Sequence, residues 1–175
     1  MNTPNKLTLI RVLLIPVYIF VFLKEMYILA IVIFSIASIT DYFDGQLARK
    51  NNLVTNFGKI MDPLADKALV YTAFVLLSPY PVYRWMIIVI LFREFLVSGI
   101  RIVAASNGHV IAAAFSGKAK TFIQMFAVPF LLLSLACPLS VAVSLVSKIL
   151  LYASLVLTVY SGAEYTFKNI GVFKD

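Results

Sequence analysis

The chain has very little of the residue types that build disulfide frameworks and zinc sites. Its 175 residues include one cysteine, Cys137, and one histidine, His109. A disulfide within the chain is therefore impossible, and no metal site can be built from cysteine and histidine. Charge is scarce as well, because only 13% of the residues are charged, whereas soluble domains carry roughly 25%.

What the chain has instead is hydrophobic sequence, at 62% of its residues and a mean hydropathy of +0.96. This composition predicts an all-α integral membrane protein, and the length suits a single domain, residues 1–175. The hydrophobic residues fall in six predicted transmembrane helices: roughly Leu7–Leu23, Met26–Thr40, Ile60–Leu77, Tyr83–Ala105, Lys120–Cys137 and Leu139–Tyr160.

Some of these segments are shorter than the ~20 residues that a spanning helix needs. We therefore expect the second to continue to about Phe43 or beyond, and the third to begin near Asn56. The first lacks a small-residue cleavage site before Lys24, so we expect it to be retained rather than removed as a signal peptide.

The net charge of +7 raises the possibility of nucleic-acid binding, but the basic residues form no run or stripe. They lie between the hydrophobic segments, as the positive-inside rule predicts. With six helices, both termini face the same side, and eleven basic residues fall on that side against two on the other. We therefore expect a multi-pass protein of the cytoplasmic membrane, with both termini in the cytoplasm and no nucleic-acid partner.

Four carboxylates stand out in this acid-poor chain. They follow a fixed pattern within 26 residues: Asp41, Asp44-Gly45, Ala48-Arg49, then eight residues, Gly58, Asp62 and Asp66. Acids three or four apart share one face of a helix, and two antiparallel helices would bring both pairs together. Oxygen-only ligands suit Mg²⁺ or Mn²⁺ rather than zinc. Two such ions would clamp a pyrophosphate and stabilise the oxygens of a phosphoryl transfer.

Simpler explanations exist for parts of this pattern. The four acids could merely solvate a loop, although their neighbours, such as Tyr42, Phe43 and Ile60, are apolar. Gly45 and Gly58 would let a substrate approach the backbone closely, but helix packing alone could also require them. Arg49 offers a planar fork for phosphate oxygens.

The complete pattern, D-x-x-D-G-x-x-A-R-x8-G-x-x-x-D-x-x-x-D, resembles the motif of the CDP-alcohol phosphatidyltransferases at every fixed position. The resemblance implies that an alcohol hydroxyl attacks the β-phosphorus of a CDP-linked lipid and releases CMP. It also implies that the two metal ions are held by Asp41, Asp44, Asp62 and Asp66, with Asp66 as general base. The CDP-lipid would be bound by Asp41, Gly45, Ala48, Arg49, Thr55 and Gly58.

Other segments resemble the branch of that family that makes phosphatidylglycerophosphate. They are Pro4–Thr8 with Arg11 and Pro16, Arg93–Gly99 with Arg101, Gly117–Thr121 and Ser161–Tyr165. This resemblance implies CDP-diacylglycerol as donor, sn-glycerol 3-phosphate as acceptor, and a homodimer in the membrane lipid. Arg93 and Glu94 lie deep in a hydrophobic segment, where ionisable residues usually have a function. We expect the acceptor phosphate to be bound by Arg93, Arg101, Lys118 and Lys120, although one of the two lysines could only anchor the interface.

Two alternatives remain open on the sequence. The chain could use another acceptor, such as inositol phosphate, serine or phosphatidylglycerol. It could also be a small cation transporter whose acids line an ion pathway, but Gly45, Ala48 and Arg49 would then have no role.

Overall fold

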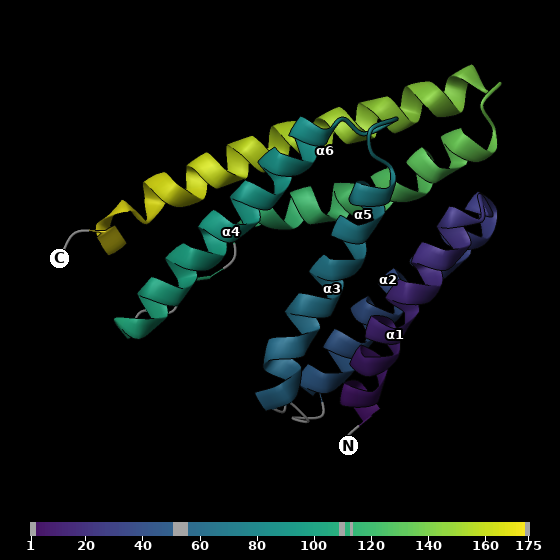
Figure 1. Cartoon of the computed structure of the whole chain (residues 1–175). Helices are drawn as coiled ribbons and strands as arrows, with labels where there is room; N and C mark the ends of the chain where they lie inside the picture. Colours follow the sequence, from purple (N-terminus) through teal and green to yellow (C-terminus); the bar gives the residue numbers. More distant parts are fainter. Residues whose placement is uncertain (1–2, 51–55, 109–110, 113, 174–175) are drawn as a thin grey trace.

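The structure is a computed structural model, and the regular elements of its described part are all helices. The structure describes the backbone of residues 3–50, 56–108, 111–112 and 114–173, and the side chains of residues 9–40, 64–65, 67–108, 111–112 and 114–171. Within these ranges it contains six α-helices and a short 3₁₀ turn: α1 (Thr3–Leu23), α2 (Tyr27–Lys50), α3 (Asn56–Leu76), α4 (Arg84–Ser106), α5 (Phe115–Ala136), α6 (Val141–Lys168) and η1 (Ile170–Phe173) (Figure 1).

The six helices match the six predicted segments, and the adjustments expected from helix length are confirmed. Helix α2 continues through the acidic motif to Lys50, and α3 begins at Asn56. The prediction was wrong at three other boundaries: α1 begins four residues before Leu7, α5 begins five residues before Lys120, and α6 runs on to Lys168. All three extensions add polar turns, which hydropathy alone does not assign to a helix.

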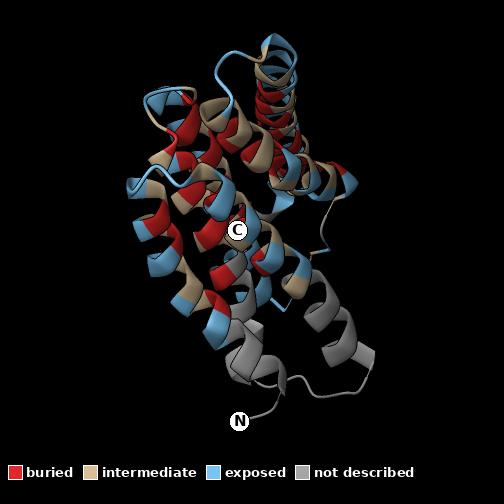
Figure 2. Cartoon of the chain, turned by 90° about the vertical axis from the view of Figure 1, so that its right-hand side faces the viewer, coloured by how far each residue is buried: buried red, intermediate tan, exposed pale blue. Residues whose placement is uncertain are grey.

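The hydrophobic core runs between the facing sides of all six helices. Its large, fully buried members include Tyr18, Phe34, Phe74, Met86 and Leu131, one from each of α1 to α5. A smaller cluster of Val97, Ile100 and Tyr165 joins α4 to α6. Figure 2 shows the buried residues on the sides of the helices that face one another.

The outer surface is apolar, and several polar residues are buried. Large side chains such as Phe92, Phe95 and Phe122 are exposed, whereas Glu94 and Lys120 are buried. Exposed large apolar side chains of this number are unusual for a soluble monomer. Among the described residues, α5 and α6 are long and apolar enough to cross a membrane. This arrangement is consistent with a membrane protein, in which polar side chains turn inward.

The acidic motif and two of the turns between helices lie at opposite ends of the molecule. The last turns of α2 and the first turns of α3 lie together at the bottom of Figure 1, close to the start of α1. The turn between α1 and α2 and the turn between α5 and α6 lie at the opposite, upper right end. The fold therefore gathers the ends of α1, α2 and α3 where the motif is located.

Candidate active site

The acidic motif lies on two successive helices that meet at one end of the molecule. The backbone of α2 carries Asp41, Asp44, Gly45, Ala48 and Arg49, and that of α3 carries Gly58, Asp62 and Asp66. The side chains of these residues, and Thr55 entirely, lie outside the described residues. Their predicted roles toward metal and CDP-lipid therefore stay predictions.

The chemistry of this donor set fits a hard divalent cation. Within the described side chains, no three residues of the metal-binding types Asp, Glu, His and Cys come together. The motif, by contrast, carries four aspartates on adjoining helix ends and no sulfur or imidazole. Carboxylate oxygens are the ligands that Mg²⁺ and Mn²⁺ prefer, so the residues present suit the group that the motif predicts.

A second charged group lies between α3, α4 and α5, and its side chains are described. Glu94 of α4 accepts a hydrogen bond from Lys120 of α5 at Oε1, with Nζ 2.5 Å away. The same oxygen accepts from Arg93 Nη1 at 2.7 Å. The other oxygen, Oε2, lies 3.1 Å from the ammonium of Lys67 on α3. We name these four residues the Glu94 cluster.

The Glu94 cluster is buried on one side and open on the other. The side chain of Lys120 is 2% exposed, whereas that of Lys67 is 40% exposed. Lys67 also lies 3.4 Å from the hydroxyl of Ser98, one turn further along α4. Lys67 therefore marks the accessible side of a cluster whose other members are held inside the bundle.

Two glycines make room for the side chain of Arg93. A Cβ atom at Gly162 of α6 would lie 2.9 Å from Arg93 Cγ, and one at Gly117 of α5 would lie 3.0 Å from Nη2. Both distances are shorter than ordinary van der Waals contacts. A side chain at position 162 would therefore displace the stem of Arg93, and one at position 117 would push its guanidinium aside. Arg93 is thus fixed between two helices, and its buried Nε has no partner within the described part of the chain.

The other two predicted phosphate ligands lie apart from this cluster. Arg101, two turns beyond Glu94 on α4, donates from Nε to the hydroxyl of Tyr165 at 3.0 Å and stacks on its ring. Lys118 is exposed in the first turn of α5, while Lys120 is buried. The structure therefore brings Arg93 and Lys120 together, but it places Arg101 against α6 and Lys118 at the surface.

Lys67 and the contacts that hold α6 were not predicted from the sequence. Lys67 is one of the eleven basic residues expected on the cytoplasmic side, and its position directly after Asp66 is the signal that could have singled it out. Ser116 of α5 donates to Glu164 of α6 at 2.5 Å, and Lys168 donates to the same carboxylate at 2.6 Å. With the Arg101–Tyr165 bond, these contacts join α4, α5 and α6 beside the Glu94 cluster.

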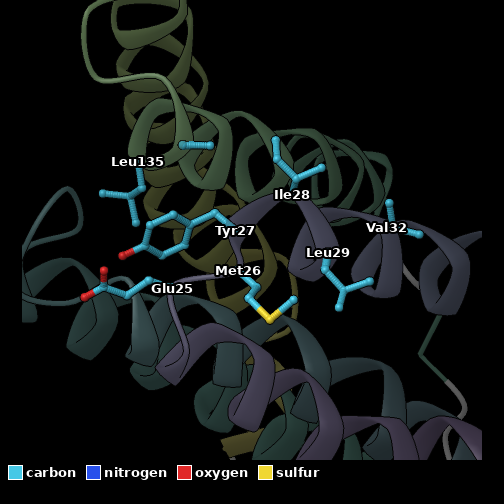
Figure 3. Close-up of a pocket in the computed structure, with 8 residues that line it drawn as sticks. Glu25, Met26, Tyr27, Ile28, Leu29, Val32 and Leu135 are labelled. Atoms are coloured by element: carbon cyan, nitrogen blue, oxygen red, sulfur yellow. The ribbon is translucent and has the colours of Figure 1, made fainter.

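A groove at the opposite end of the molecule does not belong to this site. It is bounded by the turn between α1 and α2 and by the end of α5, and Figure 3 shows Tyr27 beside Leu135 there. Its lining is mostly apolar, with Glu25 as its charged residue. None of the described residues that line it belongs to the Glu94 cluster.

Comparison with known proteins agrees with the motif. The model of the CDP-alcohol phosphatidyltransferase family matches residues 1–160. A CDP-diacylglycerol–glycerol-3-phosphate 3-phosphatidyltransferase of Bacillus subtilis is 42% identical over 96% of this chain and 95% of its own length. One of Rickettsia bellii is 42% identical over 94% and 93%. A probable phosphatidylglycerophosphate synthase of Mycobacterium tuberculosis is 37% identical over 97% and 82%. The chain belongs to the CDP-alcohol phosphatidyltransferase family.

Proposed function

We propose that this chain transfers the phosphatidyl group of CDP-diacylglycerol to sn-glycerol 3-phosphate, giving phosphatidylglycerophosphate and CMP. The observation that carries the proposal is the near full-length similarity to relatives whose names specify this donor and this acceptor. The complete acidic motif supports the same reaction. The family match favours a transferase over the cation transporter that the sequence alone left open.

The chemistry follows from the residues of α2 and α3. Asp66 accepts the proton of the acceptor hydroxyl, whose oxygen forms a bond to the β-phosphorus of the donor. The bond between that phosphorus and the oxygen of CMP breaks, and CMP leaves. Asp41, Gly45, Ala48, Arg49, Thr55 and Gly58 hold the cytidine diphosphate part of the donor.

Asp41, Asp44, Asp62 and Asp66 would hold two divalent ions, Mg²⁺ or Mn²⁺. When bound, such ions neutralise charge on the diphosphate and on the oxygens of the phosphoryl transfer. The carboxylates alone would repel that diphosphate, so the chain's own residues need a counter-charge to bind the donor.

The acceptor phosphate is placed by cationic side chains of α4 and α5. Arg93 and Lys120, together in the Glu94 cluster, support this assignment, because charge-assisted hydrogen bonds are the usual means of holding a phosphate. Arg101 and Lys118 would complete the pocket once acceptor binds.

The setting is a cytoplasmic membrane. We propose that residues 1–175 form one domain of six transmembrane helices, with both termini and the acidic motif on the cytoplasmic side. The distribution of basic residues and the exposed apolar helix faces support this topology. The acyl chains of the donor then stay in the hydrocarbon while its head group reaches α2 and α3. The resemblance to the family supports a homodimer.

The experiment that tests the function measures CMP release by the purified protein in lipid–detergent micelles. CDP-diacylglycerol is supplied with Mg²⁺ or Mn²⁺, and the acceptor is varied among glycerol 3-phosphate, inositol phosphate, serine and phosphatidylglycerol. Release with glycerol 3-phosphate alone is the expected result. Release with another acceptor but not with glycerol 3-phosphate would refute the proposal and leave only the family chemistry.

A further inference from the structure

Glu94 is a carboxylate in a place where the proposed reaction needs cations. It is buried, it would repel an acceptor phosphate, and it lies between two of the side chains expected to bind that phosphate. A buried acid at such a position costs free energy unless it is fully paired. Its pairing with three cations from three helices therefore calls for an explanation.

We infer that Glu94 is a positioning residue that gathers Lys67, Arg93 and Lys120 into one rigid acceptor-binding group, of which Lys67 is a further member. The inference rests on the proposed function, since it concerns the phosphate of the acceptor. It assigns Lys67 a role in acceptor binding and gives Glu94 a role through its partners rather than through the substrate.

The charge of the cluster supports this inference. Three cations and one carboxylate leave a net charge of +2, which matches the dianionic phosphate of the acceptor. Without Glu94, three cations would repel one another inside the bundle. With it, the cations are held in place before the substrate arrives, so that binding costs less ordering of side chains.

The geometry shows which side of the cluster a ligand can reach. Oε1 of Glu94 is occupied by the two least exposed cations, Lys120 and Arg93, while Oε2 faces the half-exposed Lys67. The Nε–H of Arg93 is buried and has no acceptor among the described residues, so Arg93 retains a donor for a further oxygen. An anion entering from the side of Lys67 would meet cations that are already oriented.

The Glu94 cluster also lies next to the turn of α3 that carries the proposed base. Lys67 follows the proposed base, Asp66, directly in the chain, and its ammonium is held by Glu94 and by Ser98 of α4. The ion pair therefore fixes this part of α3 against α4. A phosphate bound at Lys67 would keep the acceptor within reach of the turn of α3 that carries Asp66.

The test measures binding without requiring turnover. Glycerol 3-phosphate is titrated against the purified protein, and the rise in unfolding temperature reports binding. Inorganic phosphate serves as a second probe, and glycerol at equal concentration serves as the probe that lacks phosphate. Stabilisation by both phosphate compounds but not by glycerol is expected for the unchanged chain.

Glu94→Gln keeps the shape of the side chain and removes its charge. The concentration of glycerol 3-phosphate needed for half of the stabilisation should rise about tenfold or more, since a charge-assisted network loses its anchor. In the turnover assay, KM for glycerol 3-phosphate should rise by a similar factor while KM for CDP-diacylglycerol changes less than about twofold. Glu25→Gln, the same substitution at the opposite end of the molecule, should change neither.

Lys67→Met tests whether Lys67 belongs to the acceptor site. This variant stays informative if Glu94→Gln fails to fold. It removes the most exposed partner and leaves Glu94 paired with Arg93 and Lys120. The concentration of glycerol 3-phosphate needed for half of the stabilisation should rise about threefold to tenfold in Lys67→Met, and it should return toward the original value in Lys67→Arg. Unchanged binding in Lys67→Met excludes Lys67 from the acceptor site.

Other outcomes separate this inference from the proposed function. Tighter phosphate binding in Glu94→Gln would mean that the carboxylate competes with the phosphate, and it would overturn the inference, as would equal losses in Glu94→Gln and Glu25→Gln. Normal binding by Glu94→Gln with CMP release by the unchanged chain would overturn the inference alone. A third outcome is that Glu94→Gln loses phosphate binding while the unchanged chain releases no CMP with glycerol 3-phosphate. That outcome would overturn the proposed function, but it would support the Glu94 cluster as a site for a phosphate anion.

Discussion

The acidic motif and the Glu94 cluster are both charged groups inside an apolar chain, yet they are assembled in opposite ways. The motif places four aspartates within 26 residues, on two successive helices. The Glu94 cluster draws Lys67 from α3, Arg93 and Glu94 from α4, and Lys120 from α5. A site built locally leaves a fixed spacing in the sequence, whereas a site built across helices leaves only isolated charges.

The two regions also differ in what their charges need. Four aspartates on two successive helices would repel one another and a diphosphate, and divalent ions would provide the counter-charge. The Glu94 cluster contains its own counter-charge and remains cationic. The difference suits a division of tasks, in which one region holds the diphosphate of the donor through metal ions and the other holds the phosphate of the acceptor directly.

The largest expected effect is at the proposed base. Asp66→Asn keeps the shape of the side chain but cannot accept a proton, so turnover should fall at least ~10²–10⁴-fold. The variant should still bind CDP-diacylglycerol to an appreciable degree, as measured by competition with a labelled donor. Full activity of this variant would remove Asp66 from the role of base.

The next effect concerns the metal ligands. Asp41→Asn and Asp62→Asn should each reduce CMP release and raise the Mg²⁺ or Mn²⁺ concentration needed for half of the activity, because each removes a charged ligand. Removal of divalent ions with a chelator should abolish release, and adding either ion back should restore it. Activity that persists in excess chelator would show that the motif works without metal ions.

A smaller effect is expected from crowding Arg93. The Cβ atom of Gly162→Ala would lie 2.9 Å from Arg93 Cγ and displace that side chain. Such overpacking typically costs ~1–3 kcal/mol of folding stability. The displaced guanidinium would also lose about one hydrogen bond to the acceptor phosphate, so KM for glycerol 3-phosphate should rise roughly fivefold or more. Gly99→Ala is the matched control, since a Cβ there meets nothing within 4 Å. An unchanged KM in Gly162→Ala would separate Arg93 from acceptor binding.

The smallest effect is expected at Arg101, which already has a partner in Tyr165. Arg101→Ala should raise KM for glycerol 3-phosphate about threefold to tenfold, as the loss of one typical hydrogen bond does, and should raise KM for the lipid donor less. Steady-state kinetics with each substrate varied in turn gives both values. The reverse order of the two effects would place Arg101 in the donor site.

The helices and the motif could be predicted from the sequence because both are encoded by local patterns. Hydrophobic length predicted six helices, and the need for about 20 residues to span a bilayer predicted that α2 would continue into the motif. Isolated charges in the fourth segment, Arg93 and Glu94, indicated a functional position. The family model matches residues 1–160, a range that includes the motif.

The contacts between helices could not be predicted, because they depend on packing. Nothing in the spacing of Lys67, Glu94 and Lys120 says that their side chains meet. The glycines at 117 and 162 were part of recognisable segments, but their physical reason, room for Arg93, emerges only from the packing of α5 and α6. The first turn of α5 and the last turns of α6 were not predicted, because these turns are polar. They are held by hydrogen bonds of Ser116 and Lys168 to Glu164 and not by apolar packing.

The central claim, that this chain joins CDP-diacylglycerol to glycerol 3-phosphate, is tested most directly by the products. The purified protein is incubated with CDP-diacylglycerol, labelled glycerol 3-phosphate and Mg²⁺, and the lipid and nucleotide products are identified by mass. If the proposed function is right, CMP and labelled phosphatidylglycerophosphate are formed in equal amounts, and neither product is formed when the acceptor is left out. CMP without labelled lipid, or no CMP at all with this acceptor, would contradict it.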